Sequence, residues 1–400
     1  MSVFKQRLVL WLLILLAVLV AFSSHPLIVD ISRSAGIEKG SILSKYIIVV
    51  FVFLFALCFK WKEITKSKQI RIYSFFVLWI LVFSVFTMGI FSDNKLFGEV
   101  RALVICLVAM SIGWQLRLSE PQMRIVLLVY AIGTLYVGVM QVTNNVGGFV
   151  IEDQYLTDNK NALGVMLATS IAVLVYIATE VHSRKIWSVL WWIGVVALFA
   201  IILTIRARAA TLIAFFALLL IIYRRVQRSY FILAIAAIPA IVLLGMLIIP
   251  SSLIDFVTNS FFSGYEGGDI TSDRSIRNQM ALNYFSLHPL LGNLQHGSEH
   301  FGWIHNYPLL QLFNNGLVFG FPILCLYVYL FFIIIKGSLR SKVDNIGEVG
   351  FFAALVPFIV SLAEPTFPYG PGTATVFNFI LLGVAIKSQT IKNEEHSVNY

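Results

Sequence analysis

Long apolar runs are the feature of this sequence that most restricts its fold. A helix needs about 20 apolar residues to cross a bilayer. Runs near that length lie at about residues 8–24, 46–59, 72–91, 101–116, 125–143, 162–179, 186–205, 209–223, 230–250, 309–335, 349–363 and 374–387. The shorter runs would draw on flanking residues or on locally thinned bilayer. Together the runs predict an all-α polytopic membrane protein with about 12 transmembrane helices.

The composition agrees with this fold class. Charged residues make up 12% of the chain and hydrophobic residues 59%, whereas soluble proteins carry about 25% charged residues. Most of the chain therefore has no water to face. Cys58, Cys106 and Cys325 fall inside the apolar runs without CxxC spacing, so we predict neither a disulfide framework nor a zinc site.

The cations are placed to orient the helices rather than to bind nucleic acid. The net charge is +9, but lysine and arginine form short clusters between apolar runs, which is typical of topogenic charge. A cytoplasmic N-terminus would put 19 of the 29 cations inside the cell, in segments 5–7, 60–71, 117–124, 184–185, 224–228, 336–342 and 387–392. We therefore predict a multi-pass protein of a bacterial inner membrane with both termini in the cytoplasm. The first run resembles a signal peptide, but the runs that follow favour an uncleaved anchor.

This topology divides the chain into three parts. Residues 1–250 would form helices 1–9, residues 251–308 a large periplasmic loop, and residues 309–400 helices 10–12 with a cytoplasmic tail. The loop is unusually long, and long loops in compact proteins are functional or disordered.

The loop also carries a helix signal. Cap-like residues at 271–273 precede an apolar stripe of Ile276, Met280, Ala281, Tyr284 and Phe285, which ends before Pro289 and Gly292. This spacing predicts a short amphipathic helix that lies along the membrane surface.

Two arginine pairs on the periplasmic side need partners. Arg206 and Arg208 lie in a tight turn between apolar runs with no acid nearby, and a guanidinium there could bind a phosphate or could snorkel to the interface. Arg208 is the preferred candidate. Arg274 and Arg277 open the amphipathic helix at i, i+3 spacing; they could pair with Asp273 on the surface or form a second diphosphate clamp, with Arg277 the better candidate.

Other polar residues on the same side suggest proton transfer and sugar binding. His305 and Asn306 lie where the loop meets the tenth run, and histidine suits proton transfer from a sugar hydroxyl. Taken alone, a histidine at a membrane edge is more often an interfacial hydrogen-bonding residue. Asp158, Lys160 and Glu364 could contact sugar hydroxyls or could be solvated surface. His296 and His300 have i, i+4 spacing but no third ligand, so we predict no metal site. No nucleotide-binding motif is present, and we predict no cofactor.

Four segments in this order resemble motifs of the O-antigen ligase/polymerase superfamily. Residues 158–164, which include Lys160, Asn161 and Gly164, resemble the opening of a central span, and residues 204–210 resemble a short Ser/Thr-Arg turn. Arg277 with the stretch 286–292 resembles the "R…hPlxG" motif of the large loop. His305-Asn306 with Gly316 and Gly320 resembles the "HN…GlxG" motif. The resemblance covers about residues 155–322.

The resemblance implies a GT-C-like helical fold and a metal-independent, inverting glycosyltransferase. The donor would be an undecaprenyl-diphosphate-linked glycan, and the acceptor a glycan or lipid A-core. By this resemblance Arg208 and Arg277 would hold the diphosphate, and His305 would be the base or would orient the acceptor. Membrane lipids, chain-length regulator proteins and flippase proteins are the partners that it suggests.

The resemblance leaves the reaction partner open. The ligase pattern would place Gly, Thr or Tyr where this chain has Phe319, with glycine one step later. This departure and the Lys160-Asn161 pair favour an O-antigen or exopolysaccharide polymerase slightly over a ligase that acts on lipid A-core. Two alternatives belong to other functional classes. A lipid-linked oligosaccharide transporter or flippase would often show internal repeats, and we find none in the sequence. A scaffold without chemistry would leave the external arginines unexplained.

Overall fold

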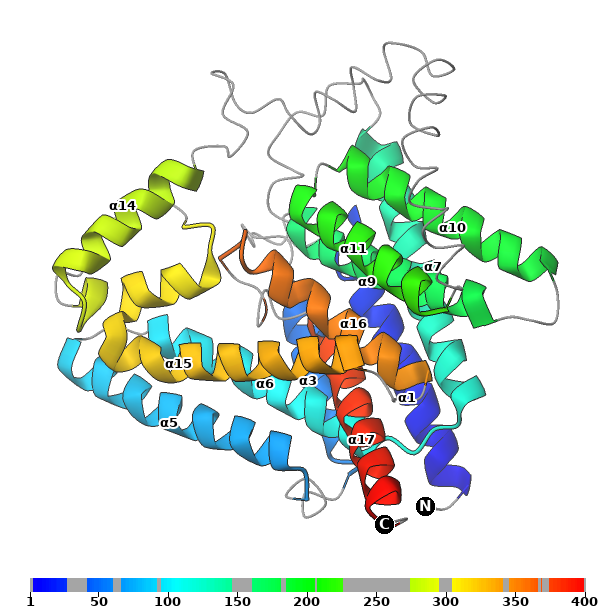
Figure 1. Ribbon diagram of the computed structural model, residues 1–400, viewed down its shortest axis with the longest axis horizontal. Coiled ribbons are helices and arrows are strands. Elements are labelled where there is room, and N and C mark those ends of the chain that lie inside the picture. The colour runs from blue at the N-terminus through cyan, green and yellow to red at the C-terminus, as the bar shows by residue number, and fades with distance from the viewer. Residues whose placement is uncertain are drawn as a thin grey trace.

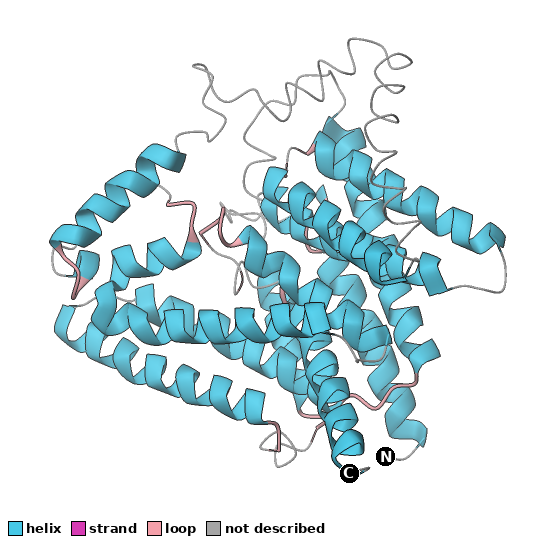
Figure 2. Ribbon diagram, viewed as in Figure 1, coloured by secondary structure: helices cyan, strands magenta, loops and turns pink. Residues whose placement is uncertain are grey.

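The computed structural model describes residues 3–26, 42–59, 66–91, 95–145, 160–180, 185–205, 207–225, 274–294, 304–340, 345–365, 368 and 374–398. Within these ranges the chain forms α-helices and one short 3-10 turn, and no strand (Figure 2). The elements are α1 (Val3–Phe22), α3 (Ile42–Ala56), α5 (Lys68–Phe91), α6 (Lys95–Gln115), α7 (Glu120–Asn145), α9 (Lys160–Glu180), α10 (Lys185–Thr204), α11 (Arg208–Arg225), α14 (Arg274–Leu287), η1 (Gly292–Leu294), α15 (Tyr307–Arg340), α16 (Asn345–Val360) and α17 (Val376–Val398).

The helical membrane class expected from the apolar runs is confirmed. In the part of the chain that the structure describes, seven helices are long and apolar enough to cross a membrane, namely most of α1, α5, α6, α7, α9, α10 and α15. Shorter apolar helices cover 46–56, 208–223, 346–360 and 376–391. The run predicted at 230–250 lies outside the described residues. The total of about 12 spans therefore remains a prediction.

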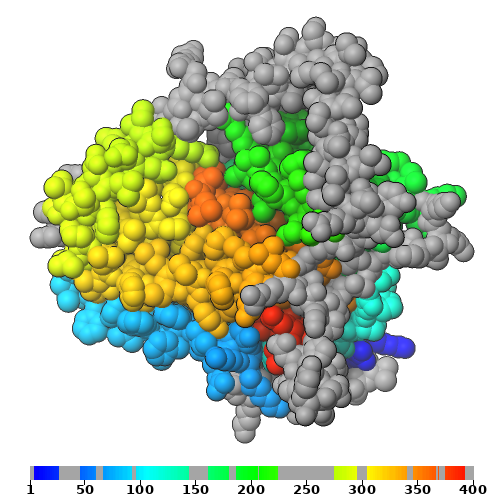
Figure 3. Space-filling view, viewed as in Figure 1, coloured from blue at the N-terminus to red at the C-terminus, as the bar shows by residue number. Residues whose placement is uncertain are grey.

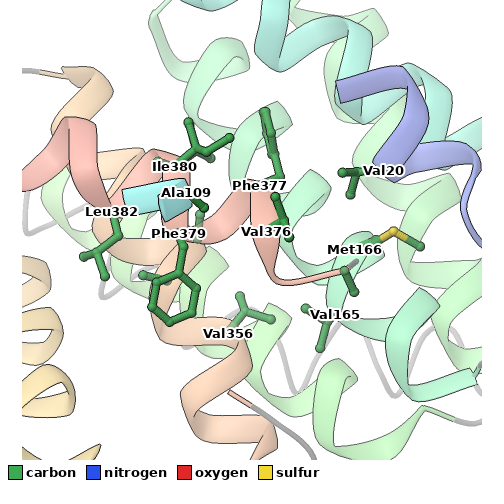
Figure 4. Close-up of a cluster of buried hydrophobic side chains, with 14 of the residues drawn as sticks. Val20, Ala109, Val165, Met166, Val356, Val376, Phe377, Phe379, Ile380 and Leu382 are labelled. Carbon is green, nitrogen blue, oxygen red and sulfur yellow. The ribbon is translucent and has the colours of Figure 1, made fainter. Parts of the chain in front are cut away.

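α9 is the central helix of the bundle. In the part of α9 long enough to span a membrane, 94% of the residues are buried. In α5 and α10 the corresponding share is 22%, and apolar side chains are exposed. α9 packs against α7, α10, α11 and α16, while α17 joins α16 to α6 (Figure 1). Side chains from several of these helices, including Val165, Val356 and Phe377, meet in the apolar core (Figure 4). A helix buried on all sides is apolar all round, which explains the lack of a polar face on α9.

Glycines allow the closest helix contacts. Gly113 of α6 faces Gly383 of α17, and a side chain at either position would collide with the backbone of the partner helix. Gly350 of α16 lies equally close to the backbone of α17 at Leu381. Small residues are typical of membrane helix interfaces, because apolar side chains gain little from leaving lipid and close backbone approach supplies the attraction instead.

α15 is broken at Gly316, which has φ 60° and ψ −167°. Gly292 also has a positive φ, 56°, and its backbone lies directly against that of Gly316. The N–H groups of Leu317 and Val318 begin the second part of α15 and donate to the carbonyls of Pro289 and Leu290 at 2.8 and 3.0 Å. The loop after α14 thus supplies the hydrogen bonds that the break in α15 removes.

The amphipathic helix predicted in the large loop is present as α14, but its predicted buried stripe is only partly right. Ala281 and Tyr284 are buried, whereas Ile276 is 58% and Met280 is 44% exposed. α14 packs on the first part of α15 (Figure 3). In this contact the rings of Tyr284 and Phe313 have centroids 5.2 Å apart. Helical periodicity identifies the apolar residues of α14 but does not show which of them are buried against protein and which stay exposed. The cap predicted at 271–273 lies outside the described residues.

Candidate active site

Glu364 is the centre of a polar cluster at the end of α16. Its side chain is buried, with 4% of the residue exposed. Oε1 lies 2.9 Å from Nη2 of Arg274, and Oε2 lies 3.4 Å from Nδ1 of His305. A buried carboxylate is tolerated when it is paired and hydrogen-bonded. Glu364, predicted as a contact for sugar hydroxyls, therefore has protein partners on both oxygens.

Arg274 links α14 to the turn that follows α16. Besides its ion pair with Glu364, its Nη1 donates to the carbonyl oxygen of Ala363 at 3.0 Å. The sequence suggested a surface pair with Asp273 or a phosphate clamp, and Asp273 lies outside the described residues. The partner found here is 90 residues away in the chain. Both terminal nitrogens of this guanidinium are thus engaged within the protein.

Asn306 is the N-terminal cap of α15. Its Oδ1 accepts the N–H of Leu309 at 2.9 Å, and its Nδ2 donates to the carbonyl of Leu362 at 3.1 Å. The next residue, Tyr307, donates its N–H to the carbonyl of Ser361 at 2.8 Å. Capping by an asparagine side chain explains why the helix starts here. These contacts fix the His305 segment against the end of α16.

His305 has one ring nitrogen directed at protein and one available. Nδ1 faces Glu364, the side chain is 22% exposed, and Nε2 makes no hydrogen bond with the residues that the structure describes. In a neutral imidazole that donates from Nδ1 to the carboxylate, Nε2 carries the lone pair. Nε2 can therefore accept a proton from a bound hydroxyl group.

Arg277 lies on the same face of α14 as Arg274 and Ala281. It is one turn after Arg274 and one turn before Ala281, which packs in a cluster with Ile304. Residues three and four apart on a helix are neighbours, so Arg277 shares a helix face with Arg274, which binds Glu364, and with Ala281. It is half-buried and forms no hydrogen bond or ion pair with any described residue. A half-buried guanidinium without a protein partner is a candidate for binding an anion.

The other two motif segments also pack on each other. A side chain at Gly164 of α9 would meet Ala207 and Ala210 of the turn that opens α11. Arg208 is the first residue of α11 and is half-buried, and Asn161 lies in the first turn of α9. The start of α11, the end of α16 and the start of α14 lie at the same end of the bundle (Figure 1). Arg206, Asp158 and the side chain of Lys160 lie outside the described residues.

One acidic residue in this region escaped the sequence analysis. Glu99 of α6 lies beside α15, where its Oε2 accepts a hydrogen bond from the hydroxyl of Tyr307 at 3.1 Å. The sequence shows Glu99 as an acid at the edge of an apolar run. An acid in that position is itself a candidate functional residue. Within the described part of the chain, no group of three or more His, Cys, Asp or Glu side chains could hold a metal ion.

Comparison with known proteins finds no family model and no curated protein that matches this chain.

Proposed function

We propose that this protein is an integral membrane glycosyltransferase that moves a glycan from undecaprenyl diphosphate to a sugar hydroxyl at the periplasmic face. The observation that carries the proposal is the position of Arg277, which meets no described residue and shares a face of α14 with Arg274, the partner of Glu364. Glu364 also holds Nδ1 of His305. An anion-binding group beside an oriented base, at one end of an apolar bundle, suits a lipid-borne phosphate substrate.

The reaction follows from these two groups. The acceptor oxygen forms a bond to C1 of the donor sugar as the bond from C1 to the diphosphate oxygen breaks, with inversion at C1. His305 Nε2 takes the proton of the acceptor hydroxyl. Arg277 stabilises the negative charge that develops on the departing diphosphate, because a fixed guanidinium needs no reorganisation during the step. The phosphoester of the donor supplies the driving force.

Glu364 and Arg274 act through their neighbours in this scheme. Glu364 holds the imidazole in the orientation that leaves Nε2 available, and it stabilises the imidazolium that forms when the proton is taken. Arg274 ties α14 to Glu364 and Ala363 and so sets the position of Arg277. Arg208 is proposed as a second diphosphate ligand, which is supported by its place at the same end of the bundle as α14.

The broken α15 is a feature that transporters share, because interrupted helices often form ion or substrate sites in them. Here the N–H groups after the break, at Leu317 and Val318, donate to Pro289 and Leu290. They are therefore not available to an anion, and we favour glycosyl transfer. Polymerase and ligase use the same site chemistry and differ in the acceptor, with the polymerase slightly favoured by the sequence.

The test uses the purified protein in lipid nanodiscs with an undecaprenyl-diphosphate-linked glycan. His305→Ala and Arg277→Ala should abolish glycan transfer without loss of expression or membrane insertion. His288→Gln and Arg124→Ala are matched controls, since His288 packs on Tyr284 and Arg124 pairs with Glu120 on α7. Full activity of both alanine variants would refute the mechanism.

A gene deletion separates the two acceptors. Loss of the polymerase should leave a single repeat unit on the lipopolysaccharide core. Loss of the ligase should leave finished polymer on the lipid carrier.

A further inference from the structure

Glu99 has no cationic partner among the described residues, unlike Glu120 and Glu364. Glu120 lies 2.8 Å from Arg124, and Glu364 lies 2.9 Å from Arg274. Glu99 instead meets only neutral groups among the described residues, namely the hydroxyl of Tyr307 and the side-chain amide of Gln311. A carboxylate within an apolar helix that faces the bundle and lacks a cation is expected to serve a function.

A line of polar side chains continues from Glu99 along α15. Tyr307, Gln311 and Asn315 follow at i, i+4 and i+8, and Asn315 Nδ2 donates to Gln311 Oε1 at 2.9 Å. Gln311 is 1% and Asn315 is 2% exposed. Even so, Gln311 Nε2 and Asn315 Oδ1 make no hydrogen bond of good geometry. Gln311 Nε2 is the donor with which this side chain faces the Glu99 carboxylate, so the polar line leads to Glu99.

The polar line is continuous with the candidate active site. Tyr307, which touches Glu99, follows His305 by two residues and is bound to Ser361 three residues before Glu364. Glu99 is half-buried, whereas Gln311 and Asn315 are buried. A molecule in contact with His305 Nε2 could therefore extend to Glu99.

We infer that Glu99 forms a subsite for the sugar of the acceptor, with its carboxylate bound to the sugar hydroxyl groups. This inference rests on the proposed glycosyl transfer. The carboxylate accepts hydrogen bonds from hydroxyls, and the Gln311 amide beside it helps to hold it in place. Tyr307 positions the carboxylate. Because the described groups around the carboxylate carry no charge, the subsite favours a neutral or amino sugar and disfavours a uronic acid.

The first test measures binding without any turnover. Saturation-transfer NMR is recorded for methyl glucoside, methyl glucosaminide and methyl glucuronide with the full protein in nanodiscs at neutral pH. The glucoside and glucosaminide should bind and the glucuronide should not. Glu99→Gln should weaken the first two about tenfold or more, as expected for loss of a charge-assisted hydrogen bond, and should remove the discrimination against glucuronide.

Glu120→Gln is the matched control, because Glu120 also faces a tyrosine hydroxyl, that of Tyr176 at 3.4 Å, in a different part of the bundle. It should leave all three affinities unchanged. Absence of glycoside binding to the wild type, or equal binding by wild type and Glu99→Gln, would overturn the subsite.

A second variant distinguishes sugar binding from a purely structural role. If Glu99 only anchors Tyr307, then Tyr307→Phe and Glu99→Gln should have the same effect, on kcat alone. If Glu99 binds the acceptor, Glu99→Gln should raise the acceptor KM well above that of Tyr307→Phe. Equal acceptor KM values in the two variants would refute the inference.

Binding of undecaprenyl diphosphate, followed by native mass spectrometry, tests the proposed function separately. If that lipid binds through Arg277 while the glycosides ignore Glu99, the subsite fails and glycosyl transfer stands. If the lipid does not bind but the glycosides depend on Glu99, the sugar site stands and the donor assignment fails.

Discussion

His305 Nδ1 and Glu364 Oε2 lie 3.4 Å apart, although 59 residues separate them in the chain. The same carboxylate holds Arg274 of α14 through its other oxygen. One buried side chain thus connects His305, the end of α16 and the helix that carries Arg277. The position of the site depends on this carboxylate.

Replacing Glu364 by glutamine should lower kcat for glycan transfer with little change in donor KM. A positioned base contributes about 10²–10⁴-fold to rate, and loss of its orientation and charge partner should remove at least about tenfold. Glu364→Asp, which keeps the charge, should restore part of the rate. Steady-state kinetics in nanodiscs measures this, and an unchanged kcat in Glu364→Gln would show that the carboxylate serves only packing.

Arg277→Lys should weaken donor binding almost as much as Arg277→Ala. Lysine keeps the charge but lacks the planar fork that binds two phosphate oxygens at once. Arg124→Ala should leave donor binding unchanged, because Arg124 forms a solvent-exposed pair with Glu120, and such pairs contribute about 0–1 kcal/mol to stability. Native mass spectrometry with undecaprenyl diphosphate is the measurement. Wild-type affinity in the lysine variant would argue against a bidentate phosphate contact.

Gly316→Ala and Gly292→Ala should each lower the melting temperature. A left-handed backbone costs a residue with a side chain about 1–2 kcal/mol, and here the added Cβ would also collide with the opposing backbone. Gly89→Ala is the control, since nothing lies within 4 Å of a Cβ there, and alanine favours a helix by about 1 kcal/mol. Thermal unfolding in detergent compares the three. Equal melting temperatures would mean that α15 is not held by the glycine contact.

His25 should make stability depend on pH. It follows α1 and lies against Phe22 and Tyr136, with ring centroids 5.7 and 5.9 Å away, and burial lowers its pKa from the usual 6.5. The unfolded chain then takes up a proton at a higher pH than the folded protein. Stability should therefore fall as pH drops below about 6.5 and level off below the folded pKa.

His25→Phe keeps the stacking and removes the titration, so its melting temperature should lack this component of the pH dependence. Melting temperatures between pH 5 and pH 8 provide the comparison. Parallel curves for the two proteins would contradict the assignment to His25.

Much of the fold was accessible from hydropathy, because each span must satisfy its own backbone hydrogen bonds and must be apolar along its length. The runs at 72–91 and 125–143, for example, correspond to α5 and α7. Hydropathy did not reveal the break at Gly316, since an apolar run looks the same whether its helix is continuous or interrupted. It also did not reveal which face of α14 is buried.

The sequence by itself determined that this is a helical membrane protein and which polar residues stand out from its apolar runs. Only the tertiary structure decided how those residues pair. Arg274 and Arg277 share a helix face and differ little in sequence context, yet one meets Glu364 and the other meets no described residue. The physical reason is that helical periodicity acts over a few residues, whereas the partner of a buried charge is set by the packing of helices that lie far apart in the chain.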